Sequence, residues 1–265
     1  MGRIMDNNKT LRNEITKGVI WKQLLLFFFP ILLGTFFQQL YNTIDAIVVG
    51  RFVGGNALAA VGGSSGQIIN LIVGFFMGLC SGATVTISQF FGSGDRRKVN
   101  EGIHTLYAFS VIGSVVITIL GVVLAPWLLT IMKTPAEQYA DSLLYLRIYF
   151  GGVFFVFIYN TGAAILRALG DSKRPLIYLI ICCFVNIVLD LILVVGCGLG
   201  VAGVAIATLA AQAVSAGLVT VALMRSSDIC DFALREIRLY GSSLKMQLYI
   251  GLPGGVQGSM YSLTI

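Results

Sequence analysis

Long apolar runs, recurring about six times along the chain, most constrain what this sequence can fold into. A helix needs about 20 consecutive apolar residues to cross the hydrocarbon core of a bilayer, and these runs reach that length. Hydrophobic residues make up 57% of the chain and charged residues only 11%, whereas a soluble domain carries about a quarter charged residues. Because backbone groups in lipid must be paired within the span, the runs predict an all-α, polytopic membrane protein.

The runs and the polar segments between them predict a lobe of six transmembrane helices and the start of a seventh. The predicted spans are residues 23–50, 57 to beyond 82, 103–132, 142–166, 175–196 and 201–224. The divisions are a cytoplasmic N-terminal segment at 1–22, the lobe at 23–225, a cytoplasmic inter-lobe linker at 226–247 and a truncated helix 7 at 248–265.

Proline positions indicate that a second repeat begins near the end of the sequence. Pro253 lies near the start of the last apolar segment, as Pro30 lies near the start of the first. Transporters are often built from paired repeats of this kind. We therefore expect one half of a twelve-helix, two-lobe transporter, with a seven-helix protein as the alternative.

Lys and Arg are distributed unequally between the two ends of the predicted helices. Fifteen of the 18 lie in the N-terminal segment or in loops on the same side, and the other three are Arg51, Lys133 and Arg147. Since cytoplasmic loops carry the excess of basic residues, we expect a multi-pass protein of the cell (inner) membrane with a cytoplasmic N-terminus. This arrangement explains the net charge of +6 without a nucleic-acid partner.

Two acidic residues lie inside apolar runs, whereas the other ten fall in polar segments or at helix ends. At 1.5 Å per residue, Asp45 lies about 9 Å from the outer end of the first span, and Asp190 lies roughly 22 Å from the inner end of the fifth. A carboxylate in hydrocarbon costs about 2.5–3.5 kcal/mol on insertion scales, so such residues usually have a function. The pair predicts an acidic pocket in the outer half of the lobe.

Polar side chains on the same and neighbouring spans are predicted at a similar depth. Tyr41 and Asn186 each lie one turn from one of the two acids, on the same helix face. Thr208, on the sixth span, lies roughly 12 Å from the outer side. We also expect Gln67, on the second span, behind this group.

The oxygens of this group suit two kinds of coupling ion. Two close carboxylates in a low dielectric repel each other when both are ionised, so the pair can hold a proton. Hard cations such as Na⁺ prefer oxygen ligands. In the Na⁺ case the ligands would be Asp45, Asn186, Asp190 and Thr208. The alternative is a structural hydrogen-bonded cluster between helices.

Other polar residues are interpreted as structural. His104, the only histidine, is expected to be solvated near the cytoplasmic end of the third span, and Asn160 is expected to bond between helices. Without a membrane-embedded histidine, a metal centre or a nucleophile–base pair is disfavoured, and with it a membrane enzyme. No cofactor is expected besides the coupling ion, H⁺ or Na⁺.

Several motifs resemble the multidrug and toxin extrusion (MATE) family. They are QQLYNTIDAIVVG at 38–50, ALAAVG at 57–62, SQFFGSGD at 88–95, LRALGDSKRP at 166–175 and the N-x-x-x-D pattern at 186–190. The resemblance implies a twelve-helix, two-lobe antiporter that exports drugs by alternating access, with a C-terminal lobe as the partner of this chain. It also implies an N-lobe cation site at Asp45, Asp190, Asn186, Tyr41 and Thr208, and a first helix that bends at Pro30.

A flippase for lipid-linked oligosaccharides or lipid II, from the same superfamily, is the alternative function. Such substrates carry pyrophosphate, for which a basic cavity is expected. The charges expected deep in the membrane here are acidic. The sequence therefore favours export of small organic, often cationic, compounds.

Overall fold

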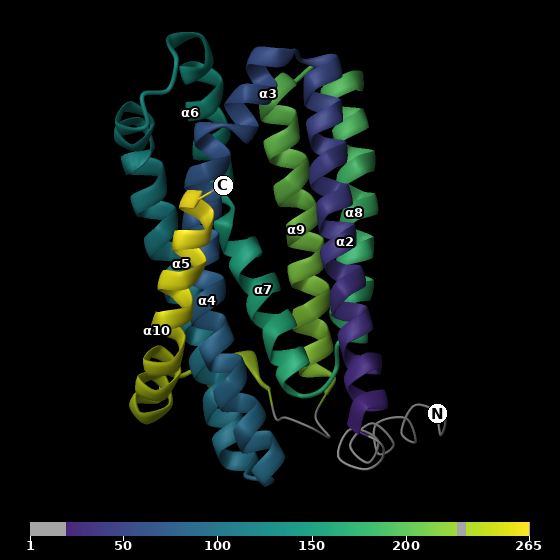
Figure 1. Ribbon diagram of the computed structural model, residues 1–265, viewed down its shortest axis with the longest axis vertical. Coiled ribbons are helices and arrows are strands. Elements are labelled where there is room, and N and C mark those ends of the chain that lie inside the picture. The colour runs from purple at the N-terminus through teal and green to yellow at the C-terminus, as the bar shows by residue number, and fades with distance from the viewer. Residues whose placement is uncertain (1–19, 227–231, 265) are drawn as a thin grey trace.

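The computed structural model describes residues 20–226 and 232–264, which form helices and connections without a strand. The helices lie side by side along the long axis of the molecule (Figure 1). Five are long and apolar enough to cross a membrane, or six when the bent pair α6–α7 is one span. This confirms an all-α, multi-pass membrane lobe. Most of the N-terminal segment predicted at 1–22 lies outside the described residues.

The helices follow the predicted order. Their bounds are α2 Ile20–Phe52, α3 Gly55–Gly62, α4 Ser64–Ser93, α5 Arg96–Ile131, α6 Ala136–Gly151, α7 Val153–Ala168, α8 Lys173–Asp190, the π-helix η1 Leu191–Gly196, α9 Gly200–Met224, the 3₁₀ turn η2 Leu234–Glu236 and α10 Gly241–Thr264. Four predicted spans agree with the structure, and their ends differ from the observed helix ends by at most two turns. The first span corresponds to α2, the third to α5, the fifth to α8 together with η1, and the sixth to α9. We name the end of the lobe where α2 finishes the outer end, after the predicted orientation, and the opposite end the inner end.

Two of the predicted spans are interrupted at glycines, so the prediction of unbroken helices there was wrong. The second span divides at Gly63, whose backbone (φ −78°, ψ −120°) is not helical. The fourth divides at Gly152, where α6 and α7 meet at a bend of 52°. A Cβ on Gly152 would lie 2.5 Å from the side chain of Leu209 on α9, so a larger residue at this position would displace the Leu209 side chain.

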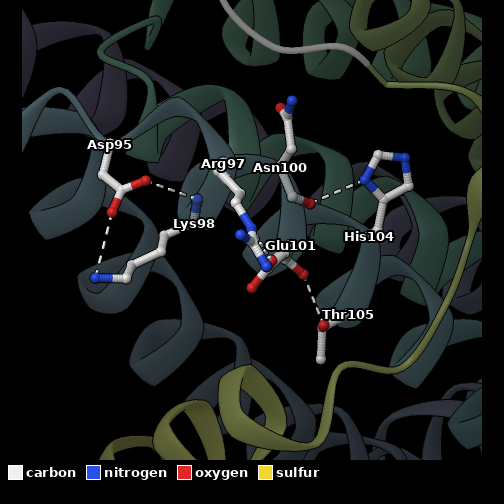
Figure 2. Close-up of polar contacts among 7 residues, drawn as sticks. All are labelled: Asp95, Arg97, Lys98, Asn100, Glu101, His104 and Thr105. Atoms are coloured by element: carbon white, nitrogen blue, oxygen red, sulfur yellow. Dashed lines mark hydrogen bonds and ion pairs between the residues drawn. The ribbon is translucent and has the colours of Figure 1, made fainter.

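The loop between α4 and α5 is fixed by local polar contacts at the inner end. Asp95 accepts a hydrogen bond from the backbone N–H of Lys98 at 3.1 Å and pairs with its Nζ at 3.2 Å (Figure 2). A side-chain acceptor at this position satisfies a backbone donor that the first helical turn leaves unpaired. Gly94, with φ 76°, ends α4. The sequence of this loop therefore specifies a tight inner turn.

His104 is buried, which overturns the prediction of a solvated residue. Its side chain is only 4% exposed, and its Nδ1 lies 2.8 Å from the carbonyl oxygen of Asn100 (Figure 2). The ring of Phe232 covers it, with the ring centroids 5.4 Å apart. Phe232 belongs to the linker, so the burial depends on a contact between segments that are distant in sequence.

The seventh helix, α10, packs lengthwise against α4. Glycines meet in three pairs, which we name the glycine seam: Gly74 with Gly258, Gly78 with Gly254 and Gly82 with Gly251. Small residues allow the backbones of membrane helices to approach closely. α10 begins at Gly241, earlier than predicted, and is less apolar than the five spans. The segment expected to open a second lobe is thus seated on the first.

Candidate functional site

Asp45 and Asp190 come together between α2 and α8. A Cβ on Gly34 of α2 would lie 3.7 Å from the side chain of Leu179 on α8. From that contact, 11 residues along each helix lead to Asp45 and Asp190, so the two acids lie level. Asp45 is within interacting range of Asp190 and Asn186. Asp190 and Asn186 are fully buried, so the two acids and the amide lie together between α2 and α8.

α9 brings Thr208 to the same region from the opposite direction. The hydroxyl of Ser215 on α9 donates a hydrogen bond of 3.2 Å to the carbonyl oxygen of Tyr178 on α8. About two turns outward from this contact, Thr208 on α9 and Asn186 on α8 lie level. Thr208 is also buried. Counted from this contact, the hydroxyl and the amide thus share one depth.

Three tyrosines lie near the acids, Tyr41 on α2 and Tyr145 and Tyr149 on α6. Tyr41 is within electrostatic range of Asp45 and of Tyr145 and Tyr149. The latter two are buried, with ring centroids 6.2 Å apart, and Tyr145 is also within range of both acids. Sequence reasoning missed Tyr145 and Tyr149. Their i, i+4 spacing on one helix face is the signal that could have indicated them.

Several buried polar atoms of the pocket have no hydrogen-bond partner within the described ranges. They are Oδ1 of Asp45, Oδ1 and Nδ2 of Asn186, both carboxylate oxygens of Asp190 and Oγ1 of Thr208, and Oε1 of Gln212 on α9 is likewise buried and unpaired. An unpaired buried polar group costs about 1–3 kcal/mol. Such a concentration of oxygens fits a bound cation or a shared proton. Gln212, one turn from Thr208, was missed from the sequence.

The structure does not place Gln67 or Pro30 among the residues around Asp45 and Asp190. The side chain of Gln67 is exposed near the start of α4, and its backbone N–H donates to Gly63 at 3.0 Å. Pro30 is buried within α2, which continues through it as one helix of 33 residues. The contribution of Gln67 to the site and the bending of α2 at Pro30 both stay predictions.

α8 changes its helical geometry directly after Asp190. The segment Leu191–Gly196 is a π-helix, and the N–H of Cys197 bonds to the carbonyl oxygen of Ile192 at 2.9 Å. π-helical turns are rare in proteins overall, but those that occur are often found at functional sites. The buried acid therefore occupies the last α-helical position before a wider turn.

The fold defines the class of this molecule: a lobe of membrane-spanning helices with a buried acidic group between them. The family model described as MatE matches residues 30–192, which is more than half of the chain. The chain belongs to this family of membrane transporters.

Known relatives match nearly the whole chain. "Probable multidrug resistance protein YpnP" of Bacillus subtilis is 31% identical over 92% of this chain. A multidrug resistance MATE family transporter of the MOP superfamily, solved in an outward-facing conformation, superposes on 97% of the chain with a TM-score of 0.87 and 29% identity. A MOP superfamily transporter from Pyrococcus furiosus, whose binding pocket is described as reversed in polarity, gives a TM-score of 0.85 over 97% of the chain with 28% identity.

The chain spans about half the length of these relatives. It covers 54% of YpnP and 55% of each of the two solved transporters. This agrees with a chain that corresponds to the N-terminal lobe of a two-lobe transporter.

Proposed function

We propose that this chain is the N-terminal lobe of a cation-coupled antiporter that exports drugs or other small organic compounds by alternating access. The observation that carries the proposal is the group of Asp45, Asn186 and Asp190, in which Oδ1 of Asp45 and the side-chain oxygens of Asn186 and Asp190 are buried without a hydrogen-bond partner in the described part of the chain. The names of relatives such as YpnP, which refer to multidrug resistance, support the substrate class.

Cation binding in this pocket would change the balance between two conformations of the lobe. Two carboxylates that are removed from water are costly unless their charge is compensated. A proton or Na⁺ that enters from the outer end would relieve that cost and stabilise the contact between α2 and α8. A ligand shifts a conformational equilibrium only by its difference in affinity for the two states. Release of the cation on the inner side would therefore favour the other state.

α2 is the helix in which we expect the change. Pro30 has no backbone N–H, so the hydrogen bond that an ordinary residue would donate there is missing. α2 also carries Asp45 and Tyr41. Bending at Pro30 would therefore move one half of the acidic pocket relative to Asp190 on α8.

The test is substrate flux in proteoliposomes with a complete two-lobe transporter that carries this chain as its N-terminal lobe. With pH and Na⁺ gradients imposed separately, Asp45→Asn and Asp190→Asn should each abolish gradient-driven flux while the protein remains folded and inserted. Glu137→Gln, at an exposed acid on α6, should retain it. Wild-type flux in Asp190→Asn would leave the pocket with only a structural role.

The neutral ligands should have smaller and more selective effects. Asn186→Ala should weaken flux less than loss of either acid, because it removes no charge. Thr208→Ala should reduce Na⁺-driven flux more than H⁺-driven flux, since a hydroxyl oxygen ligates a metal ion but is not needed to hold a proton. Equal losses under both gradients would contradict Na⁺ ligation by Thr208.

A flippase is retained as the second candidate because the structure holds a basic residue that the sequence analysis had assigned to a loop. Arg167 lies inside α7 and is partly buried. The Pyrococcus furiosus relative, for which reversed pocket polarity is described as suggesting a different function, shows that such differences occur among similar folds. Translocation of a lipid-linked pyrophosphate, compared with flux of an organic cation in the same proteoliposomes, separates the two candidates.

A further inference from the structure

Beyond its first turn, where Phe154 and Phe155 are exposed, α7 is buried on almost all sides, and the residues that remain accessible are polar. From Val156 to Leu169, each residue is buried except Asn160 and Arg167, which are partly exposed. The two are seven residues apart, which is two helical turns, so they lie on the same face. Intramembrane ionisable residues face protein interiors or water-filled cavities rather than lipid. This face is therefore the side on which α7 meets water.

Arg167 lies on the inner half of the lobe, far from the acidic pocket. It is within electrostatic range of Cys80 on α4 and of Tyr159 on its own helix. Cys80 lies 16 residues beyond Ser64, or roughly 24 Å from the start of α4 at 1.5 Å per residue. Within the membrane-spanning helices, Asp45 and Asp190 thus lie in the outer half of the lobe and Arg167 lies in the inner half.

No carboxylate in the described part of the chain neutralises Arg167. The nearest acid in sequence, Asp171, pairs with Arg174 at 3.0 Å and also accepts hydrogen bonds from the backbone N–H groups of Lys173 and Arg174. The ion pairs of the described residues join other partners. Among residues 20–226 and 232–264, the partly buried guanidinium therefore has no anionic partner of the kind that its five donors are suited to bind.

Asn160 does not form the bond between helices that the sequence suggested. Its Nδ2 donates to the carbonyl oxygen of Val156, within α7, at 2.8 Å. This bond keeps the side chain of Asn160 on its own helix, whereas the neighbouring Thr161 contacts Ser110 of α5. The amide and the guanidinium consequently form a polar strip on one open helix face.

We propose that Asn160 and Arg167 form an anion-binding station on the inner half of the lobe, which takes the carboxylate or phosphate group of an amphipathic organic molecule. Guanidinium binds carboxylate and phosphate through paired, charge-assisted hydrogen bonds. The inference deepens the proposed export function, on which it rests for the idea that this face lines the transport path. It extends the substrate class from cations to molecules that also carry an anionic group.

Site-directed labelling of the chain in nanodiscs tests this station without any transport assay. Asn160→Cys is treated with two methanethiosulfonates of similar size, one bearing a sulfonate and one a trimethylammonium group, and labelling at position 160 is followed by mass spectrometry. We expect the anionic reagent to react faster than the cationic one. Adding Arg167→Gln should lower the ratio of the two rates about tenfold, because one charge acts on the two reagents with opposite sign.

Two further variants separate local charge from misfolding. Arg167→Lys keeps the charge and should largely restore the ratio. Arg147→Gln removes an exposed arginine on α6 and should leave the ratio unchanged. Absence of labelling at position 160, preference for the cationic reagent, or an unchanged ratio in Arg167→Gln would each overturn the proposal.

The source of the anionic group is determined by protection against labelling. In phosphatidylcholine nanodiscs, protection by 1-naphthoate but not by 1-naphthylmethylammonium supports a soluble anion. Protection that requires phosphatidylglycerol nanodiscs supports a lipid headgroup. Protection by neither overturns the station as a binding site. Failure of Asp190→Asn to stop cation-driven flux would overturn the coupling proposal and leave these labelling results unaffected.

Discussion

Gly78 of α4 and Gly254 of α10 lie so close together that a side chain on either would press against the backbone of the other. A Cβ on Gly254 would be 3.1 Å from the carbonyl oxygen of Gly78. The same relation recurs one turn away, where a Cβ on Gly251 would lie 2.7 Å from the carbonyl oxygen of Leu79. The position of α10 on the lobe is therefore determined by the absence of side chains along the seam.

Gly78→Ala should destabilise the chain and move α10 away from α4. Overpacking a close contact costs about 1–3 kcal/mol, and the clash here is with backbone, which cannot rotate away. Thermal unfolding in detergent should begin at a lower temperature than in the wild type. Gly113→Ala is the matched control, because a Cβ on Gly113 meets nothing within 4 Å. Equal unfolding temperatures for the two variants would contradict a seam that depends on glycine.

The bend at Gly152 should be coupled to Leu209. Gly152→Ala alone is expected to destabilise the chain, because its Cβ would overlap the side chain of Leu209. In the presence of Leu209→Ala the same change should cost less, since the overlapping atoms are gone. Unfolding free energies of the two single variants and the double variant give the coupling directly. Additive effects would show that the bend does not depend on this contact.

The N-terminal turn of α5 should lose protection in acid. The backbone N–H of Lys98, which donates to Asp95, holds the pKa of this carboxyl below its usual value. A lowered pKa in the folded state stabilises that state above the unfolded value of about 3.9, and this contribution is lost as the pH falls through the folded value. Hydrogen exchange of the first turn, corrected for intrinsic rates, should show this loss. Asp95→Asn should keep the cap and remove the dependence on pH.

Cysteine labelling in intact cells tests the predicted orientation. Cysteines that replace Lys98 and Lys173 should be shielded from impermeant reagents outside the cell, whereas one that replaces Lys133 should react. Lys98 lies in the first turn of α5 and Lys173 starts α8, both at the inner end, and Lys133 follows α5 at the outer end. Reaction of positions 133 and 173 from the same side would contradict the arrangement of helices across the membrane.

The acid pair could be predicted because an ionisable residue in an apolar run is conspicuous before any tertiary contact is known. The helical period then identified Asn186 and Tyr41. Tyr145 and Tyr149 could not be singled out, since tyrosines in a membrane helix resemble ordinary core aromatics until a partner helix approaches.

The errors share a cause, which is that burial and helix breaks depend on contacts distant in sequence. His104 is buried by Phe232. A glycine in an apolar run fits a continuous span and a break equally well, so the interruptions at Gly63 and Gly152 were missed. Arg167 was assigned to a loop because a charge usually ends a span, whereas α7 extends one residue beyond it.

The π-helix after Asp190 has a consequence for how related sequences should be aligned. A π turn amounts to an α turn that has gained one residue, so Leu191–Gly196 is where the chain could lose a residue and revert to ordinary helix. Asp190 and the start of α9 would keep their places in such a relative. A one-residue gap between family members therefore belongs on this outer rim, and an alignment that places it between Asn186 and Asp190 would misassign the acid.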